Sequence, residues 1–283
     1  MIEDGMSFEL PRDRCQVMGI VNVTPDSFSD GGRYLSLRQA IDHAHRLIEE
    51  GADILDIGGE STRPGAAPVS VQEEMDRVIP VVEALARQTC TPVSVDTSTP
   101  EVMRAAVSAG AALINDVRAL RVPGALEVAA AASVPVCLMH MQGEPRTMQA
   151  RPCYGADVMG EVMGFLSSRI AACEAAGIGR ARLWIDPGFG FGKDLAHNLA
   201  LLAQLDRLRT LHCPLVVGLS RKSMLGQILG GNAVSDRLPA SLAAALWAAA
   251  QGAAVVRVHD VRATAEALRV WQAAASERAR ADG

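Results

Sequence analysis

Residues 16–59 read QVMGIVNVTPDSFSDGGRYLSLRQAIDHAHRLIEEGADILDIGG, and this stretch contains the unit from which the fold is predicted. Apolar runs rich in Val, Ile and Leu stand at its two ends, at 16–23 and 53–59. Between them, 37–51 has helical periodicity and closes with a glycine that suits a helix C-cap. Strands buried on both faces read as continuous apolar runs, so this unit predicts two parallel strands joined by a helix.

The same alternation continues to residue 260. Six further apolar runs stand at 92–96, 112–117, 135–140, 183–188, 215–220 and 255–260, with helical segments such as 71–88 and 100–110 between them. Eight strands that alternate with helices fit either an open doubly wound sheet or a closed (β/α)8 barrel. In the open sheet, ligand groups gather at one switch point, whereas in the barrel they come from the ends of many strands.

Polar residues at the ends of the runs favour the barrel. One or more stand at or just past the end of every run: Asn22, Glu60 to Arg63, Asp96, Asn115, His140, Asp186, Lys222 and His259. We therefore predict an α/β fold of one domain, a (β/α)8 TIM barrel at 15–273. An N-terminal extension at 1–14 precedes it and a C-terminal tail at 274–283 follows it.

Charge and composition argue against two classes of partner. The 283 residues carry 27 basic and 32 acidic side chains, whereas proteins that bind nucleic acid through its phosphates usually have a basic excess. The one uncharged run long enough to test as a membrane span, 238–256, is rich in alanine and contains Pro239. A packed helix that runs into a buried strand explains it better. We therefore predict no nucleic-acid partner and no membrane partner.

Cysteine usage and the N-terminus predict a cytoplasmic protein. The six cysteines show no C-x2-C spacing, so they read as thiols in a reducing compartment and not as a zinc site or a disulfide framework. The first residues are acidic and lack the apolar segment of a signal peptide.

Three strand-end residues can accept hydrogen bonds from a flat heterocycle. Asp96, Asn115 and Asp186 stand on otherwise apolar strands, and a carboxylate accepts a bidentate pair from a guanidine-like edge. The alternative is that each caps the helix that follows, as Asp96 before TSTPE would. Three such residues on three strands favour a binding role.

A second group of strand-end residues suits a phosphate or diphosphate. Arg63, Lys222, Arg257 and His259 supply positive charge or strong donors, and a helix beginning at SRKS (220–223) would add backbone N–H groups. Neutral oxygens from Asn22 and Thr62 could join the phosphates around a hard cation such as Mg²⁺. The alternative is that these charges are solvated loop residues. Two loops rich in Pro and Gly, 24–32 and 60–65, read equally well as lids or as plain connections.

Taken together, the motifs resemble those of dihydropteroate synthases. The matching segments are GIVNVTPDSFSDGG (19–32), DIGGESTRPG (56–65), SVDT (94–97), INDV (114–117), LMHMQG (138–143), DPGFGFGK (186–193), SRKS (220–223) and RVHD (257–260). The first two are highly specific, whereas SVDT or INDV alone is a weak signal. The resemblance implies a (β/α)8 barrel that forms a homodimer. It also implies a transferase of folate biosynthesis that joins 4-aminobenzoate to 6-hydroxymethyl-7,8-dihydropterin diphosphate and that sulfonamides inhibit.

The resemblance also implies roles for individual residues. The pterin would contact Asp96, Asn115, Asp186 and Lys222, and the diphosphate would contact Asn22, Thr62, Arg63, Arg257, Val258 and His259. Aminobenzoate would lie among Phe28, Arg63, Pro64, Phe191 and Ser223, and Mg²⁺ would be bound by Asn22 and Asp26. Arg63, Asp96 and Lys222 would act in catalysis, an SN1-like substitution in which diphosphate leaves before the arylamine attacks.

Three other functions fit parts of the pattern. A pterin-binding methyltransferase barrel shares the acceptors for the ring but needs neither TPDSFSDGG (24–32) nor SRKS (220–223), and both are present. A catalytically silent paralogue would be marked by loss of Arg63 or Lys222, and neither is lost. A barrel enzyme acting on sugar phosphates would ignore pterins.

Overall fold

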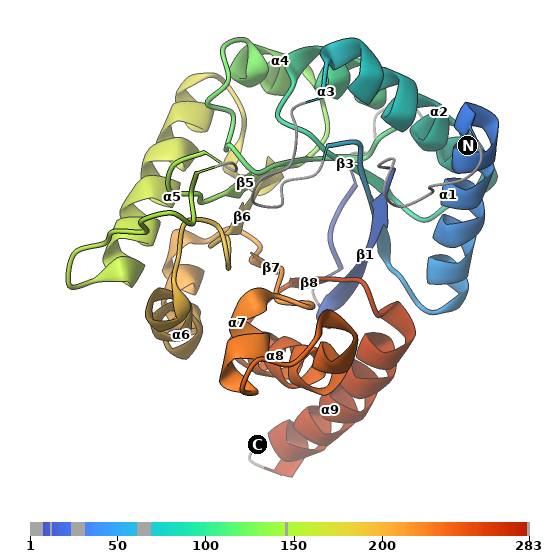
Figure 1. Ribbon diagram of the computed structural model, residues 1–283. Coiled ribbons are helices and arrows are strands. Elements are labelled where there is room, and N and C mark those ends of the chain that lie inside the picture. Colours follow the sequence, from blue (N-terminus) through green and yellow to red (C-terminus); the bar gives the residue numbers. More distant parts are fainter. Residues whose placement is uncertain (1–7, 12, 24–31, 61–68, 145–146, 282–283) are drawn as a thin grey trace.

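A closed barrel of eight parallel strands forms the centre of the molecule, surrounded by helices (Figure 1). The computed structural model describes residues 8–11, 13–23, 32–60, 69–144 and 147–281. Within these ranges the strands are β1 (Gln16–Asn22), β2 (Ile54–Gly58), β3 (Val93–Asp96), β4 (Leu113–Asp116), β5 (Val136–Met139), β6 (Leu183–Asp186), β7 (Val216–Val217) and β8 (Val255–Val258). Each coincides with one of the eight apolar runs, so the predicted barrel is confirmed.

The strand order around the barrel is β6-β5-β4-β3-β2-β1-β8-β7, and a parallel bridge between Ile185 and Leu215 joins the two ends. The helices are α1 (Gly32–Glu49), α2 (Val71–Gln88), α3 (Pro100–Ser108), α4 (Ala125–Ala131), α5 (Val158–Ala175), α6 (Leu195–Ala203), α7 (Ser223–Ile228), α8 (Leu238–Ala250) and α9 (Val261–Ala281). Local capping fixes where several begin. At α6, for example, Asp194 and His197 form a reciprocal capping box.

Alternation along the strands divides the barrel interior into an apolar floor and a polar layer above it. The floor is a buried cluster with one residue from each of seven strands: Met18, Ile54, Leu113, Cys137, Trp184, Val216 and Val255. Phe8 packs beneath it, with ring centroids 5.9 Å from Trp184. Because side chains on one face of a strand recur every two residues, Asp56, Asn115, Asp186 and Arg257 lie directly above the floor. Asp96 belongs to the same polar layer, since it is in register with Asn115. The polar residues predicted at strand ends therefore face the barrel mouth.

Two other regions bear on the sequence predictions. The uncharged run at 238–256 forms α8 and β8, as predicted, and α8 buries Ala244, Ala245, Ala248 and Ala249. No helix in the described ranges is long and apolar enough to span a membrane. The six cysteines are unpaired. The predicted tail from 274 is helical as far as Ala281, because α9 continues beyond the barrel, and residues 273–277 are exposed.

Candidate active site

The centre of the barrel mouth is an ion-pair network built on Arg257 of β8. Its guanidinium donates to Asp56 through Nε at 2.6 Å and to Asp96 through a terminal nitrogen at 2.7 Å. Asn115 donates to the same Asp56 oxygen at 3.1 Å. The structure thus brings together three predicted residues, Asp96, Asn115 and Arg257, from three separate strands.

Asp56, which links them, is not among the residues predicted from the sequence. It is fully buried, and its second oxygen, Oδ1, has no hydrogen-bond partner in the described ranges. The signal was present, because Asp56 is a carboxylate inside an apolar run and two residues after the floor residue Ile54. Reading the run with a period of two would have placed it on the inner face.

Burial sets the electrostatics of the carboxyls in the polar layer. It raises the pKa of Asp96 well above its ordinary value, and the adjacent Arg257 guanidinium opposes that shift. It also raises the pKa of Asp186, while the backbone N–H of Gly188, which donates to Asp186 at 2.7 Å, acts in the other direction. Both carboxyls are therefore acceptors that a bound donor would stabilise in their ionised form.

Lys222 brings a cation to the same mouth. It precedes α7, and its Nζ lies 4.3 Å from the centroid of the Phe191 ring. Burial lowers the pKa of Lys222 to about 8, and the Asp186 carboxylate opposes this shift. The contact joins a residue predicted on the pterin to one predicted on aminobenzoate.

The loop after β6 leaves room for this lysine because it is rich in glycine. Gly190 has φ +77°, and a Cβ there would lie 3.2 Å from Cδ of Lys222. A side chain at position 190 would therefore meet both a backbone conformation that L-residues rarely adopt and the lysine itself. Phe191 packs on an apolar cluster at the rim that contains Val117 and Met139.

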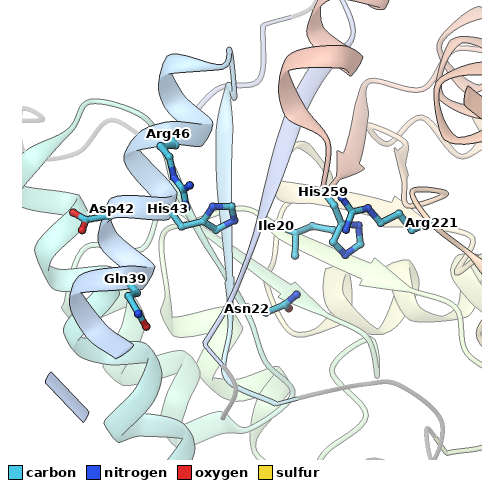
Figure 2. Close-up of a pocket in the computed structure, with 8 residues that line it drawn as sticks. All are labelled: Ile20, Asn22, Gln39, Asp42, His43, Arg46, Arg221 and His259. Carbon is cyan, nitrogen blue, oxygen red and sulfur yellow. The ribbon is translucent and has the colours of Figure 1, made fainter. Parts of the chain in front are cut away.

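The side of the mouth formed by β1 and β8 carries charges of both signs, because Arg46 and Arg221 lie there with Asp42, and Arg221 is paired with Asp260. Asn22 at the end of β1 and His259 after β8 line a cavity of about 620 Å³ together with His43, Arg46 and Arg221 (Figure 2). His259 is held by Ser220, whose hydroxyl lies 3.1 Å from Nδ1 of the ring and accepts the His259 backbone N–H at 3.2 Å.

The remaining predicted residues are placed as follows. Ser223 is the first residue of α7 and is exposed at the rim. The Val258 side chain belongs to the hydrophobic core around the barrel, so only its backbone remains for a ligand. Five predicted residues lie outside the described ranges: Asp26, Phe28, Thr62, Arg63 and Pro64.

Comparison with known proteins agrees with this geometry. Residues 18–259 match the family described as pterin binding enzyme. The chain is 55% identical to the dihydropteroate synthase of Escherichia coli strain K12 over 98% of this chain and 96% of that protein. The chain belongs to the dihydropteroate synthase family. It is thus a transferase of folate synthesis, and the predicted resemblance is confirmed.

Solved structures of dihydropteroate synthases share the fold over nearly the whole chain. The Yersinia pestis enzyme, in a sulfonamide drug complex, has a TM-score of 0.90 and 54% identity, covering 96% of this chain and 98% of that one. The Xanthomonas albilineans enzyme, solved with 4-aminobenzoic acid, has a TM-score of 0.87 and 58% identity over 93% of each chain. The family match runs from β1 to just past β8 and so includes the described residues of the polar layer.

Proposed function

We propose that Asp96, Asn115, Asp186 and Lys222 bind the dihydropterin ring of 6-hydroxymethyl-7,8-dihydropterin diphosphate, which this enzyme joins to 4-aminobenzoate. The observation that carries the proposal is the polar layer above an apolar floor. Two of its carboxyls, Asp96 and Asp186, have pKa values raised by burial, and they face a mouth that also holds Lys222. A guanidine-like ring edge supplies the paired N–H donors that such acceptors lack.

In this arrangement each residue meets a different part of the ring. Asp186 accepts from the guanidine-like edge, and the Asn115 amide is held by its bond to Asp56. Lys222 donates toward the ring oxygen and N5. Phe191, whose ring lies against Lys222, forms one wall for aminobenzoate, and Ser223 at the rim offers a hydroxyl to its carboxylate.

The diphosphate lies on the side of the mouth formed by β1 and β8, near Asn22, His259 and the Arg257–His259 backbone. The cavity there is lined by Arg46, Arg221 and His259, which can donate to phosphate oxygens, and by one carboxylate, Asp42. Thr62 and Arg63 are assigned to the same group by the motif they stand in.

Mg²⁺ fits this side of the site. In the described ranges no three His, Cys, Asp or Glu side chains gather to hold a metal ion, but an amide oxygen such as that of Asn22 is a ligand that hard cations prefer. We assign Asn22 and Asp26 as its protein ligands, with substrate phosphates supplying further oxygens. When bound, the ion neutralises charge on the departing diphosphate.

The reaction follows from where charge develops. The bond between the pterin methylene carbon and the diphosphate oxygen breaks first, and the diphosphate leaves with the electron pair. Arg63 and His259 stabilise the anion, while the Asp96 carboxylate stabilises the methylene cation. The amine nitrogen of aminobenzoate then bonds to the methylene carbon and loses one proton, which gives 7,8-dihydropteroate.

Release of diphosphate by the purified protein tests this function. With the dihydropterin diphosphate and Mg²⁺ present, we expect release to depend on 4-aminobenzoate and to yield dihydropteroate. Binding of the pterin in calorimetry without any release would instead identify a silent pterin-binding barrel.

Asp186→Asn is expected to weaken binding of the dihydropterin diphosphate by about 1–3 kcal/mol, because an amide replaces a charged acceptor and presents a donor to the ring. Isothermal titration calorimetry measures the change. Asp206→Asn, at an exposed carboxylate in the segment after α6, is the matched control and should bind like the wild type. Equal affinities for all three proteins would remove Asp186 from the pterin site.

We also propose that the enzyme is a homodimer in the cytoplasm, as the family resemblance implies. Light scattering on a sizing column tests the assembly, since the dimer has twice the 29.9 kDa mass of the chain. A mass that stays at one chain across concentrations would contradict the dimer.

A further inference from the structure

Lysine is rare in this protein, and both lysines lie near the candidate active site. The chain has 25 arginines but two lysines, Lys193 and Lys222. Lys222 faces the proposed substrates, whereas Lys193 follows the glycine-rich loop 188–192 and is only 2% exposed. The reaction described above makes no use of Lys193. A buried ammonium is costly unless it is fully hydrogen-bonded, so its partners indicate what it does.

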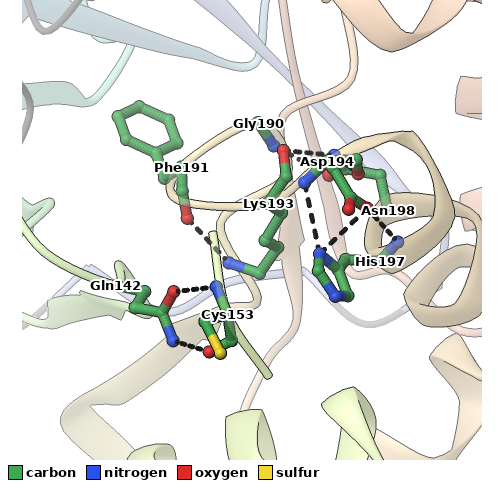
Figure 3. A network of polar contacts seen from close by, with 8 residues as sticks. All are labelled: Gln142, Cys153, Gly190, Phe191, Lys193, Asp194, His197 and Asn198. Carbon is green, nitrogen blue, oxygen red and sulfur yellow. Dashed lines mark hydrogen bonds and ion pairs between the residues drawn. The ribbon is translucent and has the colours of Figure 1, made fainter. Parts of the chain in front are cut away.

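Three acceptors surround the Lys193 ammonium. Its Nζ lies 2.9 Å from the Gly188 carbonyl oxygen, 3.1 Å from the Phe191 carbonyl oxygen and 2.9 Å from Nδ1 of His140 (Figure 3 shows the Phe191 contact). Burial, reinforced by the charge of Lys193, lowers the pKa of His140 to about 3. The imidazole is therefore neutral and can accept through Nδ1. Burial also lowers the pKa of Lys193, to about 7, and the Asp186 carboxylate opposes this shift. Below that pH one acceptor is available for each of the three ammonium protons.

Two of these bonds end on the loop that carries proposed substrate contacts. Gly188 accepts from Lys193 through its carbonyl and donates through its N–H to Asp186 at 2.7 Å. Phe191 accepts through its carbonyl while its ring contacts Lys222. The Lys193 ammonium is thus connected through Gly188 to Asp186, the carboxylate proposed to bind the pterin. It is also hydrogen-bonded directly to Phe191, the proposed wall of the aminobenzoate site.

Loop 188–192 needs hydrogen bonds such as these because its glycine-rich backbone restricts its own conformation little. Gly188, Gly190 and Gly192 all have positive φ, between +65° and +77°. Glycine populates many conformations in the absence of other restraints. Further bonds hold the middle of the loop, since Asn198 accepts from the Gly190 N–H at 2.8 Å and Gln149 donates to the Gly190 carbonyl.

We propose that Lys193 is a positioning residue that fixes loop 188–192 so that Asp186 faces the dihydropterin and Phe191 faces aminobenzoate. The proposal rests on the substrate contacts proposed above for those two residues. An arginine would not replace it, because a larger planar guanidinium does not fit a position that is 2% exposed and closed by two backbone carbonyls.

Lys193→Met tests the proposal, because methionine keeps the length of the side chain and removes its donors. We expect KM to rise about tenfold for both substrates and kcat/KM to fall about 10²-fold, the cost of a small misplacement of reacting groups. Tyr154→Phe is the matched control. Its ring lies 6.0 Å from Nζ of Lys193, and its buried hydroxyl has no partner in the described ranges, so both KM values should stay at the wild-type level.

Chemical rescue separates positioning from stability. Lys193→Ala leaves a space that n-propylammonium can fill with donors, whereas 1-propanol fills it without a charge. We expect the ammonium to restore kcat/KM at least tenfold and the alcohol not to. The ammonium can be present from cell lysis onward, so the measurement also works for a variant that folds poorly alone.

The outcomes are distinct. Wild-type KM values in Lys193→Met, with or without a lower melting temperature, would show a group that contributes to stability only, and would overturn the proposal. Equal rescue by propanol and propylammonium would also overturn it. If the wild-type protein itself forms no dihydropteroate, the proposed function fails instead, and the wild-type assay reports this separately.

Discussion

Lys222→Ala is expected to lower kcat by about 10²- to 10³-fold, the usual cost of removing one donor aimed at a site of developing charge. Lys222 is a cation placed between the Asp186 carboxylate, which influences its pKa, and the Phe191 ring at 4.3 Å. Within the described residues its ammonium makes no hydrogen bond, so little native structure depends on it. We therefore expect a folded protein with an unchanged circular dichroism spectrum. A fully active variant would exclude Lys222 from the reaction.

The pH dependence of the wild type gives the same residue a second test. Burial lowers the pKa of Lys222 to about 8, so the ammonium is present below that pH and is lost as the pH rises through it. We expect kcat/KM for the dihydropterin diphosphate to fall above pH 8, and this inflection to be absent from Lys222→Met. Gln227→Ala, at an exposed position on α7, should keep it. The same inflection in Lys222→Met would assign it to another group.

Local sequence patterns predict the barrel and much of its mouth because the strands and the residues at their ends can both be recognised from a few neighbouring positions. Eight apolar runs correspond to eight strands. Because the strands are parallel, the polar residues at their carboxyl ends all lie at the same end of the barrel. Asp96, Asn115, Asp186 and Lys222 could therefore be grouped without a structure. Their shared location follows from strand direction alone.

Other features depend on contacts that no local pattern contains. Arg257 and Asp56 are 201 residues apart in the chain, yet their side chains lie within 2.6 Å of each other. Asp56 itself could have been placed on the inner face by a period of two within its run, but its bond to Arg257 could not have been predicted. Lys193 was read as part of DPGFGFGK (186–193) without a role, because its partners are backbone carbonyls and a histidine from another strand end. Val258 stays a prediction for its backbone alone, because alternation from Arg257 turns its side chain outward.

Arg257→Met is expected to lower the free energy of unfolding by about 3–5 kcal/mol, since breaking a buried ion pair leaves uncompensated charge. The Asp56 side chain is fully buried, those of Asp96 and Arg257 are 13% and 22% exposed, and the arginine is bonded to both carboxylates. The variant should also lose measurable synthase activity, because Asp96 loses the partner that favours its ionised form. Urea unfolding followed by tryptophan fluorescence measures the first effect. A loss below about 1 kcal/mol would show that the network is solvated and not a buried pair.

The direction of the pH effect identifies the cause of this loss. Without Arg257 the folded-state pKa of Asp96 rises further above its unfolded value, so the neutral carboxyl is favoured on folding. That contribution is fully present at low pH and is lost as the pH rises through the folded pKa. The pKa of Asp96 in the wild type is already about 7, so below that pH the two proteins lose this contribution in parallel. The stability deficit of Arg257→Met should therefore grow between pH 7 and pH 9. Adding Asp56→Asn, which removes one of the two buried charges, should recover part of the deficit at pH 7, whereas an additive loss in the double variant would mean that the arginine stabilises the barrel by packing and not by charge.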